Sequence, residues 1–87
     1  MLAEVIRDPR FGRGCQGFGE DPCPVGAIVK ALVRGLQGSD VSSPERVAAS
    51  LCHYPLQTPN VGGLEGSSVE IGEREFREVH LPAWRAG

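Results

Sequence analysis

Apolar residues recur at helical spacing over two stretches of the chain, and an extended-looking run precedes each stretch. The first stretch places five apolar residues on one helical face: Val25, Ile28, Val29, Leu32 and Leu36. Asp21 is a favourable N-cap, and Pro22 suits the first helical position because the N–H that it lacks would have no partner there. The sequence therefore predicts a helix that begins at Asp21-Pro22 and stops at Gly35 and Gly38, with Gly26 packed closely against a strand.

A second helix is predicted from about Glu73 to Trp84. Three ion pairs at i,i+4 spacing would support its start: Glu70–Arg74, Glu73–Arg77 and Arg74–Glu78. Its buried stripe is expected to hold Phe76, Val79, Ala83 and Trp84. We expect Pro82 to bend or end this helix, because proline lacks the N–H that a helix needs. His80 is expected at the surface or at a helix end.

Two predicted strands alternate with these helices. Leu2 to Ile6 has the β-branched residues of a buried strand, and Arg46 to Tyr54 has small residues that suit a crowded interior. Pro55 should end the second strand, and a long loop from Gln57 to Ser68 follows it. The order strand, helix, strand, helix predicts an α/β fold with roughly two βα units.

Composition excludes several classes of protein. The chain has 87 residues and a formal net charge of −2, with its basic residues scattered, which argues against a nucleic-acid or anionic-membrane surface. It has no run of ~20 apolar residues that could span a membrane. Residues 1–6 are too short and too acidic for a signal peptide, so the compartment stays unknown. The cysteines, Cys15, Cys23 and Cys52, show no disulfide or zinc spacing, so free buried thiols and no metal site are expected.

Two short motifs suggest other chemistry, and the sequence disfavours both. Residues 12–17 match the G-x-G-x-x-G pattern of dinucleotide sites, but the helix is expected to start only at Asp21-Pro22, so no cofactor is predicted. Cys52-His53 could be taken for a nucleophilic pair. Neighbouring residues on a strand point to opposite faces, so no cysteine catalysis is predicted.

The chain contains, in order, the blocks RDPRFGR and GEDP (residues 7–13 and 19–22), VRGLQG (33–38), VAASLCHY (47–54), and EREFRE with LPAW (73–78 and 81–84). These blocks resemble the patterns R-D-P-R-W-G-R, G-E-D-P, V-R-G-L-Q-G, V-A-A-x-x-K-H-F and E-R-E-L-R-E-x-x-L-P-P-F. They are typical of the N-terminal catalytic domain of glycoside hydrolase family three, which includes β-glucosidases and β-xylosidases. Four blocks in the right order are far more specific than any one of them.

This resemblance implies a (β/α)8 TIM-type barrel, of which residues 1–87 would be a fragment, since a whole barrel needs roughly 250 residues. It places the family's nucleophilic Asp and its acid/base beyond Gly87, so no catalytic residue is assigned here. It implies a β-glycoside as the substrate of the full-length relative. The rest of the barrel or another chain is expected to cover the exposed edges. Many members of the family are secreted.

The resemblance also implies two substrate-binding residues. Arg13 matches the family arginine that hydrogen-bonds sugar hydroxyls, and a guanidinium fork can donate to two neighbouring hydroxyls. The alternative is that Arg13 only pins its loop to nearby carbonyls. His53 matches the histidine of the family's Lys-His pair. Three other family ligand positions are altered: Gln16 stands where Glu is usual, Cys52 where Lys is usual, and Leu64 where Arg is usual.

Three functional hypotheses follow. The chain could be a fragment of a β-glycosidase that hydrolyses terminal non-reducing β-linked O-glycosyl bonds, and it would then be inactive alone. It could instead be a non-catalytic remnant, or pseudoenzyme segment, that acts through a protein partner. The altered positions favour this second hypothesis, because each lost charge-assisted contact is worth about 1.5–3 kcal/mol. The third hypothesis is an independent small binding domain, which would melt cooperatively as a monomer.

Overall fold

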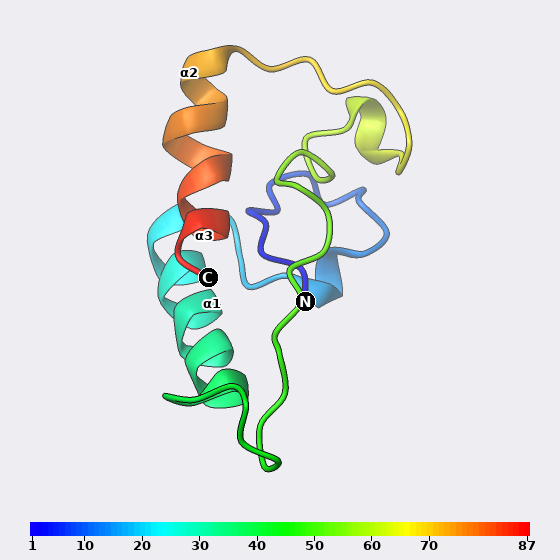
Figure 1. Ribbon diagram of the computed structural model, residues 1–87. Helices are drawn as coiled ribbons and strands as arrows, with labels where there is room; N and C mark the ends of the chain where they lie inside the picture. Colours follow the sequence, from blue (N-terminus) through cyan, green and yellow to red (C-terminus); the bar gives the residue numbers. More distant parts are fainter.

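The computed structural model describes all 87 residues, and its longest element is helix α1, Pro22–Gln37 (Figure 1). The Asp21 carboxylate accepts a hydrogen bond from the Cys23 N–H at 2.8 Å, so the predicted N-cap is confirmed. Gly38, with a φ of 61°, follows the last helical residue and donates its N–H to the Arg34 carbonyl. The stop is therefore at Gly38, where glycine tolerates a positive φ, and not at Gly35.

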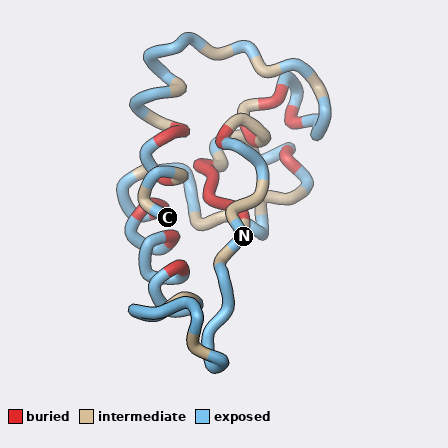
Figure 2. Tube along the Cα trace, in the orientation of Figure 1, coloured by how far each residue is buried: buried red, intermediate tan, exposed pale blue.

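The buried face of α1 is rotated from the predicted one. Val25 and Val29 are fully buried, as expected, but Val33 completes this face. Three residues of the predicted stripe stay 38–42% exposed, namely Ile28, Leu32 and Leu36. Figure 2 shows buried residues along one side of α1 only. The helix packs on one side of the molecule, so the rest of its apolar stripe has no neighbour.

The predicted second helix is confirmed, although it is not a regular α-helix. It consists of α2 (Glu73–Glu75), a π-helical turn η3 (Phe76–His80) and α3 (Leu81–Arg85), which follow one another without a break (Figure 1). Pro82 does not end it. The Leu81 N–H donates to the Phe76 carbonyl across the wide turn, directly before a proline that has no N–H to give.

The predictions for the side chains of this second helix are confirmed in part. The ion pairs Arg77–Glu73 and Arg74–Glu78 are present at 2.8 Å and 2.9 Å, whereas Glu70 makes no such pair. The expectation that His80 lies at the surface is wrong, because His80 is only 3% exposed. Helical spacing places it on one face with Phe76 and Ala83, and this face turns toward the rest of the molecule.

The two predicted strands do not form as regular strands. One isolated parallel bridge joins Leu2 to Cys52, and the Cys52 N–H donates to the Met1 carbonyl at 3.1 Å. The pairing cannot continue past this point, because His53 has a φ of 61° and Pro55 has no N–H to donate. Extended segments and helices thus follow one another in the predicted order, but no sheet forms, so the two predicted βα units are not confirmed.

The core lies where the N-terminal segment, α1 and α3 meet. It comprises Ala3, Val5, Val25, Val29, Val33 and Ala83. Gly26 allows close packing, but against α3 and the residue after it rather than a strand, since a Cβ there would lie 3.7 Å from the Ala83 Cα and 3.5 Å from the Ala86 Cβ. The segment after α1 runs away from this core and is largely exposed, and the molecule measures 43 × 24 × 18 Å (Figure 2).

Two further expectations concern the cysteines and membranes. All three thiols are free, as predicted, but Cys15 and Cys23 are exposed and Cys52 is half-buried, so the expectation of buried thiols is wrong. None of the helices has the length and apolar character needed to cross a bilayer.

Candidate functional site

The loop that carries Arg13 is held in shape by its own side chains. Asp8 accepts hydrogen bonds from the Arg10 N–H and Nε, both at 2.9 Å, and from Nη2 at 2.7 Å. These bonds to Arg10 lower the pKa of Asp8 to about 2. Arg7 donates from Nε to the Glu20 carbonyl at 3.1 Å and so ties the two ends of the loop together. Arg13 is thus presented from a fixed loop, directly before the short helix η1 (Gly14–Gln16).

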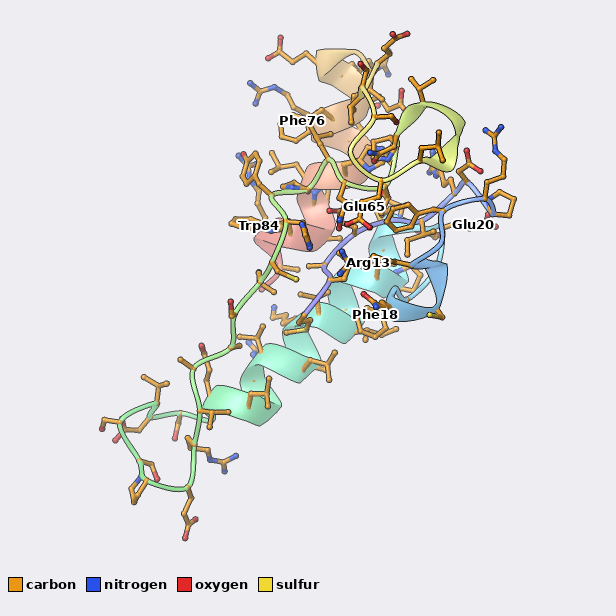
Figure 3. The ribbon with its side chains drawn as sticks, turned by 90° about the vertical axis from the view of Figure 1, so that its right-hand side faces the viewer. Arg13, Phe18, Glu20, Glu65, Phe76 and Trp84 are labelled. Atoms are coloured by element: carbon orange, nitrogen blue, oxygen red, sulfur yellow. The ribbon has the colours of Figure 1, made fainter.

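The guanidinium of Arg13 gathers side chains from three separate parts of the chain. Its Nε donates to Gln16 Oε1 at 2.9 Å, and its Nη1 donates to Glu65 Oε1 at 2.9 Å. The same Nη1 lies 3.3 Å from His53 Nε2. Figure 3 shows Arg13 and Glu65 close together in the middle of the molecule. The structure therefore brings the two predicted site residues, Arg13 and His53, into contact.

His53 reaches this site because of its unusual backbone. Its positive φ turns the chain out of the extended conformation, and such strain in a non-glycine residue is common at functional sites. A guanidinium can only donate, so the contact with Arg13 requires His53 Nε2 to accept and its proton to sit on Nδ1. The Cys52 thiol donates instead to the Met1 carbonyl at 3.2 Å. The two neighbours thus make separate contacts, and they do not form a nucleophilic pair.

Tyr54 contributes to a separate aromatic group. Its ring centroid lies 5.1 Å from that of Trp84, edge to face, and 6.1 Å from that of Phe76. Phe76 and Trp84 come from the second helix, as Figure 3 shows. Trp84 was expected in the buried stripe of the second helix, and it is half-buried against Tyr54, so this expectation is met in part.

A buried carboxylate anchors the loop from Gln57 to Ser68. Glu4 is fully buried and accepts the Thr58 N–H at 2.8 Å and the Gln57 N–H at 3.1 Å. Burial raises the pKa of Glu4, and its hydrogen bonds from Thr58 and Gln57 oppose that rise. Thr58 also donates its hydroxyl to the Val5 carbonyl at 2.7 Å. The loop is therefore fastened at its first residues to the segment that precedes Arg13.

The same loop is pressed against the Arg13 loop farther along. Gly63 has a φ of 72°, and a Cβ there would come within 2.8 Å of the Arg10 Cβ and 3.0 Å of the Arg10 carbonyl carbon. Two residues later, Glu65 binds Arg13, and its Oε1 also accepts a hydrogen bond from Gln57 Nε2. Glu65 was not singled out from the sequence, where its only signal is an acid two residues after Gly62-Gly63.

The three altered family positions, Gln16, Cys52 and Leu64, make different contacts in the structure. Gln16 is not a lost contact, since its amide oxygen accepts from Arg13. Cys52 is occupied with the Met1 carbonyl. Leu64 is 69% exposed and adds an apolar side chain to the loop surface. One of the three therefore still takes part in the Arg13 cluster, and two do not.

The cluster has hydrogen-bonding groups that the protein itself does not use. The side chains of Arg13 and Glu65 are 30% and 50% exposed, so a ligand in solvent can reach both, and their ion pair adds only about 0–1 kcal/mol to stability. Arg13 Nη2 makes no hydrogen bond within the protein, and neither does Glu65 Oε2, so a donor and an acceptor are free. The structure contains no group of three or more His, Cys, Asp or Glu side chains able to hold a metal ion.

Comparison with known families and proteins gives a consistent result. The model of the family described as "Glycosyl hydrolase family 3 N terminal domain" matches residues 2–87. The periplasmic beta-glucosidase of Salmonella typhimurium is 29% identical over 86 residues, which are 99% of this chain and 11% of that protein. The exo-1,4-beta-xylosidase of Emericella nidulans is 50% identical over 84 residues, which are 92% of this chain and 11% of that protein.

Solved structures agree with these sequence matches. The beta-glucosidase of Listeria innocua in complex with isofagomine superimposes with a TM-score of 0.93 at 34% identity, covering 99% of this chain and 12% of that one. The same enzyme has also been solved with glucose. The chain thus spans about a tenth of the length of the relatives that it matches.

Proposed function

This chain belongs to glycosyl hydrolase family 3, and we propose that it is a fragment of that family's β-glycosidase barrel. In this proposal residues 1–87 supply about two βα units of the barrel. The parent enzyme hydrolyses terminal non-reducing β-linked O-glycosyl bonds. The segments here would gain their missing sheet hydrogen bonds from neighbouring strands, since strands bonded on one side alone leave open edges.

The role of this fragment is to bind the terminal sugar. The observation that carries this proposal is the meeting of Arg13, Gln16 and His53, which come from two loops far apart in the sequence. A guanidinium and an imidazole suit the hydroxyls of a neutral sugar, since the first donates and the second can accept or donate. Both side chains reach solvent, so a sugar can approach them.

We do not expect residues 1–87 alone to hydrolyse a glycoside. A retaining glycosidase needs two carboxyl groups about 5–5.5 Å apart across the scissile bond. The two carboxylates near the cluster have other tasks, because Glu4 is fully buried under the loop and Glu65 is paired with Arg13. We therefore expect the 87-residue chain to bind sugar weakly and to leave aryl β-glycosides intact.

A second candidate function rests on a different observation. The apolar side chains of Ile28, Leu32 and Leu36 form an exposed stripe along α1, and Leu64 is exposed as well. A non-catalytic remnant that docks to another protein would use this stripe. The same stripe is also expected if it packs against the next unit of a barrel.

Sequencing the full-length transcript across both ends of the reading frame separates the two. If it continues upstream into earlier barrel strands and downstream into a strand ending in an Asp, the glycosidase proposal holds. A transcript that encodes these 87 residues and nothing more would favour the remnant. Release of nitrophenol from an aryl β-xyloside by the chain alone would contradict the proposal that it lacks the catalytic carboxylates.

A further inference from the structure

We propose that Glu65 is a positioning residue for Arg13, and that the two side chains together bind a pair of neighbouring hydroxyl groups on the sugar. This inference rests on the proposed function, and it adds to the site a residue from the loop between Gln57 and Ser68. Glu65 Oε1 lies 2.9 Å from Arg13 Nη1, and Gln16 Oε1, on the same loop as Arg13, accepts from Nε at 2.9 Å. The guanidinium plane is thereby fixed at two points, and Nη2 is left to donate.

The support of Glu65 itself reaches into the core. Gln57 Nε2 donates to Glu65, and the backbone N–H of Gln57 donates to the buried Glu4 at 3.1 Å. This series of contacts links Arg13 through Glu65 and Gln57 to a fully buried carboxylate. A side chain held in this way loses less freedom when a ligand binds, which favours affinity.

The charges of the pair predict which sugars it accepts. Glu65 neutralises Arg13, and Glu65 Oε2 makes no hydrogen bond within the protein, so it can accept a hydroxyl proton while Arg13 Nη2 donates to the adjacent oxygen. A carboxylate beside the cation also repels an anionic group. The pair therefore favours neutral sugars with adjacent hydroxyls over uronic acids.

The first test uses the NMR signals of the Arg13 guanidinium in the free 87-residue chain. We expect slow rotation about the Nε–Cζ bond and separate Nη signals in the wild type, and averaged signals in Glu65→Gln. The matched control is Glu78→Gln, because Glu78 binds Arg74 at the same 2.9 Å distance on the second helix. Unchanged Arg13 signals in Glu65→Gln, with the core signals of Val25 and Val29 in place, would overturn the positioning role.

The second test is binding of methyl β-D-xylopyranoside, followed by the same spectra. Glu65→Gln should weaken binding about tenfold or more, as the loss of one charge-assisted hydrogen bond implies, while Glu78→Gln should not. Glucuronate should bind the Glu65→Gln variant more tightly than the wild type. Equal xyloside affinity in both would overturn the hydroxyl-binding role. If the wild type binds no sugar, the proposed function fails for this chain, while the first test still decides the positioning role.

Discussion

Replacing Glu4 tests directly how the loop from Gln57 to Ser68 is held in place. Its carboxylate is fully buried and accepts the N–H groups of Gln57 and Thr58, the residues with which the loop to Ser68 begins. Replacing Glu4 with Ala removes both bonds and leaves the segment around Leu2 to Ile6 otherwise intact. We expect the loop to open locally before the helices do.

The size of this effect follows from the bonds that are lost. A buried N–H left without a partner costs about 1–3 kcal/mol, so two of them cost about 2–6 kcal/mol. Part of this cost is offset because the variant no longer buries a carboxylate, and we expect a net loss of about 2–3 kcal/mol in the loop. A domain of 87 residues has a total stability of only about 4–13 kcal/mol, so this loss is large.

Amide hydrogen exchange in the native state measures this loss residue by residue. The Gln57 and Thr58 amides should exchange at least about 30-fold faster in Glu4→Ala, since each 1.4 kcal/mol is a factor of ten. The amide of Val29 in α1 should change less. Glu45→Ala is the matched control, because Glu45 is exposed and its carboxylate makes no hydrogen bond. If both loop amides keep their wild-type exchange rates, Glu4 does not anchor the loop.

Three further perturbations test other parts of the structure. Burial lowers the pKa of His80 below 6.5. The stability that its neutral ring contributes is therefore complete above pH 6.5 and is lost as the pH falls through the folded-state pKa. His80→Leu should lose less of its free energy of unfolding than the wild type between pH 7.5 and pH 5.5, as measured by urea unfolding. Gly63→Ala forces a side chain into a φ of 72° and against Arg10, which should cost about 1–3 kcal/mol in thermal unfolding, and no loss would mean that the two loops are not in contact. Val29→Ala should cost about 2 kcal/mol or more in urea unfolding, but Leu32→Ala less than about 1 kcal/mol, because Val29 is fully buried and Leu32 is 39% exposed; equal losses would contradict the observed face of α1.

The parts of the fold that depend on local chemistry could be predicted from the sequence. Asp21, Pro22 and Gly38 define the ends of α1 through contacts within one turn, so no knowledge of the rest was needed. The buried face of α1 depends on which neighbours are present, and the pattern alone could not choose between Leu32 and Val33. His80 was misplaced because its polarity suggested solvent, whereas its helical position turns it inward.

The candidate site was predictable only where one residue carries the signal. Arg13 and His53 were singled out, and the structure brings them within 3.3 Å of each other. Glu65 could not be found in this way, because its role depends on a loop whose course is set by buried Glu4. Gln16 was expected to mark a lost contact, and it binds Arg13 through its own amide.

The most direct test of the central claim is to replace the matching segment of the Listeria innocua β-glucosidase with residues 1–87 of this chain. Hydrolysis of aryl β-glucoside and β-xyloside would then be measured for the hybrid, its Arg13→Ala variant and the isolated chain. We expect the hybrid to hydrolyse at least one substrate, the Arg13→Ala variant to lose tenfold or more in kcat/KM, as one charge-assisted hydrogen bond implies, and the isolated chain to be inactive. Hydrolysis by the isolated chain, or a folded hybrid that binds glucose no better than its Arg13→Ala variant, would contradict the account.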